Sequence, residues 1–117
     1  MVILSAALFP PVARVNRAYY EGKDQFEWLA QLKEQDPEKQ QEAIDAMCVI
    51  LQEGKLGGRD PWWDATISRR LGHYGSRAKN AVATLKRLTS HGDERVREAA
   101  LDALQKIDPE EFTKLKH

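Results

Sequence analysis

The stretch DERVREAALDAL at residues 93–104 limits the fold most, because small and large apolar residues recur in it at helical spacing. Steps of three and four residues place the following side chains on one stripe of a helix: Val96, Ala100, Ala103, Leu104 and Ile107. A stripe rich in alanine is shallow, so a second helix can approach it closely. The sequence therefore predicts helices stacked closely side by side.

Helical patterns continue along the chain, and no alternating run long enough for a convincing strand appears after Tyr20. Asp24 and Glu27 predict a capping box, and Ser76 is expected to cap a later helix. In the first helix, the apolar face is expected to comprise Phe26, Leu29 and Leu32. The expected helices cover residues 25–35, 37–53, 61–72, 77–90, 94–107 and 110–116. We therefore expect an all-α fold of antiparallel helical hairpins.

Capped helices recur along the chain, which indicates a repeat array. Superposing Asp36 on Asp93 aligns EAIDAM with AALDAL. Superposing Asp60 on Asp93 aligns Leu71 with Leu104 but otherwise gives a weaker match.

Residues 71–110, which begin LGHYGSRAKNAVATLKRL, resemble HEAT repeats, especially the bacterial HEAT-like repeats of the phycobilisome lyase class. Residues 26–47 extend the resemblance more faintly. The resemblance implies a short α-α superhelix of the armadillo type, in which Asp93 and Arg97 form structural hydrogen bonds between repeats. Ala83 stands where proline commonly kinks the first helix of a pair, so the usual cause of that kink is missing.

We expect a single HEAT-like domain over residues 1–117, with a best-matched hairpin at 76–108. The remaining parts are an N-terminal cap segment at 1–23, a first hairpin at 24–54, an irregular middle helix at 60–73 and a tail at 109–117. The apolar start MVILSAALFPP lacks the cationic lead of a secretory signal and is too short to span a bilayer. It is expected to dock on the first repeat.

The 18 basic and 18 acidic residues balance, so the total charge does not indicate a nucleic-acid or membrane partner. Their distribution is uneven, because residues 21–53 hold nine acids and three bases, whereas residues 66–92 hold no acid. That second stretch contains six basic residues: Arg69, Arg70, Arg77, Lys79, Lys86 and Arg87. This basic set could bind a phosphate backbone, or it could be the solvated side of a stacked helix that faces the acidic hairpin.

Trp62 and Trp63 open a helix, and adjacent helical positions point about 100° apart. One ring is therefore expected in the core and the other as a partly exposed anchor for a partner protein. Trp62-Trp63-Asp64 also resembles a stretch of the HEAT-like alkylpurine DNA glycosylases. The catalytic aspartate of that family would fall on Ile67, so this chain lacks it.

No pattern of catalytic, metal-binding or cofactor-binding residues is evident. Cys48 is the one cysteine and lies in an apolar run, which favours a buried residue in a cytoplasmic protein. The histidines at 73, 91 and 117 have no partner at metal-ligand spacing. We therefore expect a non-catalytic scaffold that binds a protein partner and needs no cofactor. The alternatives are nucleic-acid binding by the basic set and an accessory role related to bilin lyases.

Overall fold

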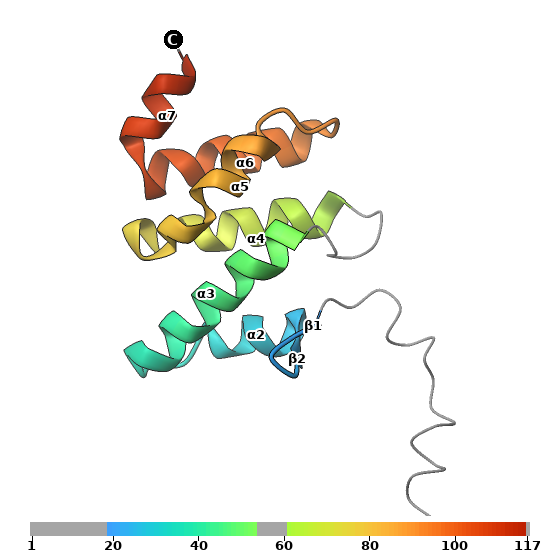
Figure 1. Cartoon of the computed structure of the whole chain (residues 1–117), viewed down its shortest axis with the longest axis vertical. Helices are drawn as coiled ribbons and strands as arrows, with labels where there is room; N and C mark the ends of the chain where they lie inside the picture. The colour runs from blue at the N-terminus through green and yellow to red at the C-terminus, as the bar shows by residue number, and fades with distance from the viewer. Residues whose placement is uncertain (1–18, 54–60, 117) are drawn as a thin grey trace, which may run out of the picture.

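A computed structural model of the protein describes residues 19–53 and 61–116, and these are mostly helical, as predicted (Figure 1). The expected N-terminal docking segment, the glycine-rich loop before Asp60 and Asp60 itself lie outside the described residues. The helices are α2 Gln25–Gln31, α3 Pro37–Glu53, α4 Pro61–Gly72, the 3₁₀-helix η2 Gly75–Ala81, α5 Val82–Leu88, α6 Glu94–Ile107 and α7 Pro109–Lys116.

A small β-hairpin precedes α2, where we expected no strand. In it β1, Tyr19–Tyr20, pairs antiparallel with β2, Lys23–Asp24. The two turn residues have positive φ, 51° at Glu21 and 80° at Gly22, as a two-residue hairpin turn of type I′ requires. Each strand has two residues, which is too few for an alternating pattern, so the sequence shows no sign of the hairpin.

The capping box of α2 is confirmed. The Glu27 N–H donates to Asp24 Oδ1 at 2.9 Å, and the Asp24 N–H donates to Glu27 Oε1 at 3.1 Å. The predicted apolar face is wrong in part, because Trp28 is 2% exposed whereas Phe26 is 48% exposed. Trp28 and Leu32, four residues apart, face the core, and the Trp28 Nε1–H is satisfied by the Tyr20 carbonyl at 2.9 Å.

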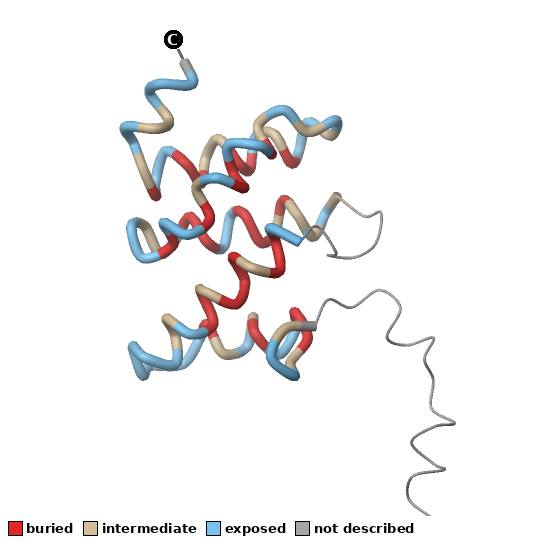
Figure 2. The backbone as a smooth tube through the Cα atoms, viewed as in Figure 1, coloured by how far each residue is buried: buried red, intermediate tan, exposed pale blue. Residues whose placement is uncertain are grey.

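The C-terminal half of α3 is buried along most of its length, and Cys48 is buried there, as its apolar run predicted (Figure 2). Its buried residues between 46 and 51 are Ala46, Met47, Cys48, Ile50 and Leu51. This half of α3 therefore forms the centre of the N-terminal part of the core.

The alanine-rich stripe of α6 is fully buried, which confirms the prediction from its spacing. Figure 1 shows α4 and α6 lying side by side, and this is the most extensive helix contact among the described residues. Gly72 shows how near the two helices come, because a Cβ built there would lie 3.1 Å from Cα of Ala103 and 3.4 Å from its Cβ. Small residues on both sides therefore permit the close approach.

The other helices complete two layers around this contact. In Figure 1, α3 and α5 cross in front of α4 and α6, with α2 and α7 at opposite ends. α3 packs against α2, α4 and η2, and α6 packs against α5, η2 and α7. The helix α4, at the place of the expected irregular middle helix, contacts α3, η2 and α6.

The helix expected at residues 77–90 is broken into η2 and α5. Ala78 has φ −102° and ψ 25°, outside the α-helical region, so a kink is present without a proline. Ser76 caps neither helix, because η2 begins at Gly75 and Tyr74 in the N-cap position makes no side-chain cap bond. The packing of η2 on α3 accounts for this change, since it holds the buried Ala78 and Ala81 against the core.

Replacing Gly72 with alanine is expected to destabilise the fold, because the new methyl group meets the backbone of Ala103. Overpacking of this kind costs about 1–3 kcal/mol, which exceeds the ~1 kcal/mol that alanine gains over glycine in a helix. Thermal and urea unfolding followed by circular dichroism measure the difference. Gly92→Ala is the matched control, because nothing lies within 4 Å of a Cβ there. Equal stability of the two variants would contradict the close approach.

Candidate functional site

The basic set does not form one open surface, because three of its members bind other helices. The Arg77 guanidinium donates to Gln40 Oε1 at 2.6 Å, to Gln41 Oε1 at 3.0 Å and to the Pro37 carbonyl at 3.2 Å. These bonds join the start of η2 to α3. Arg77 is therefore chiefly a link between helices, although its side chain lies at the surface.

Two more members of the basic set join α5 to its neighbours. Lys86 Nζ lies 2.8 Å from Glu111 Oε1 of α7, and Arg87 Nη2 donates to the Gln52 carbonyl of α3 at 3.4 Å. Hydrogen bonds from Lys86 and then from Lys114 lower the pKa of Glu111 to about 2. Arg69, Arg70 and Lys79 are exposed and have no side-chain hydrogen bond or ion pair within the described residues.

The two adjacent tryptophans differ in burial, as expected. Trp63 is half-buried against the core, whereas Trp62 is 50% exposed. The Trp63 ring packs edge-on against Trp62, with 4.8 Å between centroids, and against Phe26 of α2, with 4.9 Å. We call Phe26, Trp62 and Trp63 the aromatic surface. The sequence did not reveal that Phe26 belongs to this surface, because its spacing with Leu29 and Leu32 suggested a core position.

The expected hydrogen bonds of Asp93 and Arg97 between repeats are not found among the described residues. Asp93 caps α6 by accepting the Arg95 N–H at 2.8 Å, and its carboxylate also pairs with the Arg95 guanidinium at 3.0 Å. Arg97 donates to the carbonyls of His91 and Gly92, at 2.8 and 3.0 Å. Both residues thus stabilise the turn between α5 and α6, because this turn presents carbonyls and amides within their reach.

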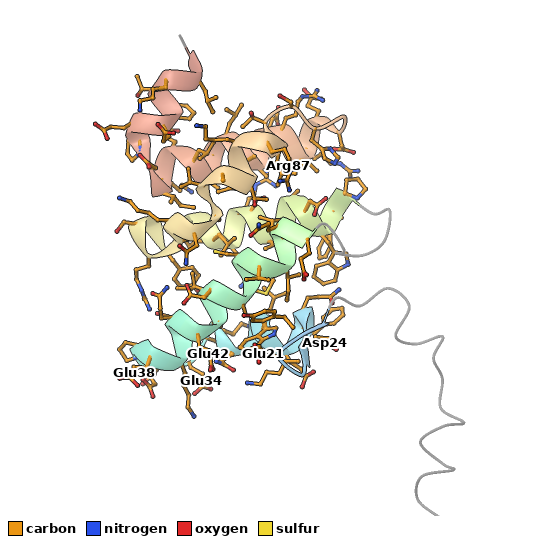
Figure 3. The ribbon with its side chains drawn as sticks, viewed as in Figure 1. Glu21, Asp24, Glu34, Glu38, Glu42 and Arg87 are labelled. Atoms are coloured by element: carbon orange, nitrogen blue, oxygen red, sulfur yellow. The ribbon has the colours of Figure 1, made fainter. Side chains whose placement is uncertain are left out.

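A groove lies beside the β-hairpin, between α2 and α3. It contains two cavities of about 440 and 450 Å³, and both are lined in part by Lys23 and Glu42. Figure 3 shows Glu21, Glu34 and Glu42 gathered at this end of the molecule, far from Arg87. The excess of acids at this end is evident from the sequence, but the groove is not, because it requires α2 and α3 to be placed side by side.

The other candidates for chemistry do not gather into a site among the described residues. Burial raises the pKa of the Asp64 carboxyl, and the nearby His91 opposes this shift. Burial, and then the Asp45 charge, raises the pKa of the Cys48 thiol to about 12, so the thiol stays neutral at ordinary pH. Ile67, at the position of the glycosylase aspartate, is fully buried. Among the described residues, no three histidine, cysteine or acidic side chains gather to hold a metal ion.

Comparison of the chain with protein-family models, with curated proteins and with solved structures finds no significant match. No helix in the described ranges has the length and apolar character needed to cross a bilayer.

Removal of the Asp93 carboxylate is expected to lower the melting temperature at neutral pH. The side-chain hydrogen bond from Arg95 is the main cause that lowers the Asp93 pKa from 3.8 to about 2. A carboxyl whose pKa is depressed in the folded state stabilises it above the unfolded pKa. That contribution is lost as the pH falls from about 4 to about 2.

The measurement is the melting temperature of Asp93→Ala and of the wild type between pH 7 and pH 2. The gap between the two is expected to narrow below pH 4. Glu98→Ala, at an exposed position of the same helix, controls for the loss of one negative charge. A gap that stays constant down to pH 2 would show that the Asp93 charge does not stabilise this turn.

Proposed function

We propose that this chain is a HEAT-like helical repeat module that binds another protein and catalyses no reaction. The helix contacts support the repeat interpretation, because α3 packs with α4 as η2 and α5 pack with α6, and α4 stacks on α6. This arrangement assigns α3 to the middle pair as its first helix, instead of to the first hairpin expected at residues 24–54. The weaker of the two superpositions, Asp60 on Asp93, then relates equivalent helices, and the aligned residues Leu71 and Leu104 are both fully buried.

The aromatic surface is the observation that carries the binding proposal. Phe26 and Trp62 each leave about half of a large ring exposed, and Trp63 between them fixes both rings by edge-on packing. Tryptophan is enriched among residues that dominate binding energy at protein interfaces. Rings held in place lose little side-chain freedom on binding, so they suit an anchor.

Nucleic-acid binding remains the second candidate, supported by Arg69, Arg70 and Lys79. These three exposed cations are not engaged by other described side chains, whereas the other half of the basic set links helices. Affinity for a phosphate backbone grows with the number of phosphates neutralised. Because only half of the basic set is available for such contacts, we favour a protein partner over a nucleic acid. An accessory role related to bilin lyases depends on the resemblance alone.

Trp62→Ala is expected to weaken binding of the partner by roughly 30-fold or more, as loss of an interface anchor does. The wild-type chain is immobilised to capture proteins from the native cell extract, and each captured protein is then purified and titrated by calorimetry. The control is Leu115→Ala, which removes an exposed apolar side chain from α7. It is expected to leave the affinity unchanged.

Two results would contradict the proposal. One is that the purified partner binds Trp62→Ala as tightly as the wild type. The other is salt-sensitive binding of a labelled oligonucleotide that disappears when Arg69 and Arg70 are changed to glutamate, which would support the second candidate instead.

A further inference from the structure

The groove between α2 and α3 already holds a cation, the ammonium group of Lys23. Its Nζ lies 4.6 Å from the centroid of the Trp28 ring and donates to Gln31 Oε1 at 2.5 Å. The Tyr20 ring stands beside the indole, with 6.3 Å between centroids. An indole face and an amide oxygen are both groups that attract a cation.

Gln31 is fixed in the orientation that suits this cation. Its Nε2 donates to the Lys39 carbonyl at 2.9 Å and to Glu42 Oε1 at 2.8 Å. Because the amide nitrogen is engaged by two acceptors on α3, the amide oxygen faces the Lys23 ammonium. The acceptor is therefore held in place by α3 and does not depend on Lys23.

The space beside the ammonium is lined by an excess of carboxylates. The first cavity is lined by Lys23, Glu27, Ala30, Gln31, Glu34, Lys39 and Glu42, and the second by Tyr20, Glu21, Lys23, Trp28, Glu42, Asp45 and Ala46. Acids outnumber lysines in each cavity, even with Lys23 in place. Each cavity is also large enough to admit a further side chain.

We infer that this groove binds a lysine side chain of a partner segment, and that Lys23 is an internal occupant which the partner's lysine displaces. The indole of Trp28 receives the incoming ammonium, Gln31 accepts its hydrogen bond, and Glu42 and its neighbours attract the positive charge of the segment. Lys23 belongs to the β-hairpin, whose strands have two residues each, and not to the helices that line the groove. Trp28 and Gln31 stay in place because they belong to α2.

This inference does not depend on the aromatic surface. Phe26, Trp62 and Trp63 line neither cavity. The groove and the aromatic surface are therefore separate, so an experiment that disproves binding at one does not disprove binding at the other.

The experiment empties the site in the full chain with Lys23→Ala and titrates a five-residue blocked peptide, lysine flanked by two alanines on each side. The same peptide with norleucine in place of lysine is the uncharged control. Chemical shifts of the Trp28 indole N–H and the Gln31 side-chain amide report binding. The lysine peptide is expected to bind Lys23→Ala roughly tenfold more tightly than the wild type, because the internal cation no longer competes. Adding Glu42→Gln is expected to reduce that gain.

Lys33→Ala is the matched variant, since it removes an exposed lysine from the same end of the molecule. The inference is overturned if the norleucine peptide binds equally well, if Lys33→Ala shows the same gain, or if a folded Lys23→Ala chain shows no saturable shift at Trp28. If Lys23→Ala does not fold, Lys23→Gln removes the charge with a longer side chain. The same three outcomes then decide.

Discussion

The close approach of α4 and α6 is the contact on which the rest of this structure depends. Gly72 lets the backbone of α4 approach Ala103 of α6, and the two helices form the most extensive helix contact among the described residues. Leu71 of α4 and Leu104 of α6, which respectively precede and follow these small residues in the sequence, are fully buried. In this pair each helix buries one face against the other. A second face of α4 is covered by α3, and a second face of α6 is covered by α5.

Polar bonds between helices explain why an uneven charge distribution yields no large basic surface. Arg77, Lys86 and Arg87 each reach an acceptor on another helix, so half of the basic set holds the layers together. Most of these acceptors are amides or carbonyls, so these basic side chains do not pair with the carboxylates of the N-terminal end. Those carboxylates surround the groove that holds Lys23. The same arrangement thus weakens the case for a phosphate ligand and strengthens the case for a cationic one.

The features that the sequence predicted correctly are local ones. The capping box of Asp24 and the buried stripe of α6 each depend on residues within a few positions of one another. The features that it missed depend on packing between distant segments. Trp28 displaces Phe26 from the core because the hairpin supplies a carbonyl for its indole N–H, and η2 departs from α-helical geometry where it packs on α3.

The candidate surfaces show the same difference between local features, which the sequence predicted, and tertiary features, which it did not. Spacing predicted that Trp62 and Trp63 would differ in burial, because two neighbours on one helix face different ways. It could not place Phe26 beside them or bring α2 against α3 to form the groove, since both require the tertiary arrangement of the helices. The contact between α3 and α4 could not be predicted from the repeat pattern either, for the same reason.

The most direct measurement of the central claim is the nuclear Overhauser effect between the Gly72 α protons and the Ala103 methyl group in the labelled, folded protein. A Cβ placed on Gly72 would lie 3.4 Å from the Ala103 Cβ, so a strong cross-peak is expected. If both signals are assigned and sharp but no cross-peak joins them, α4 and α6 are not in close contact and the account of this fold is wrong.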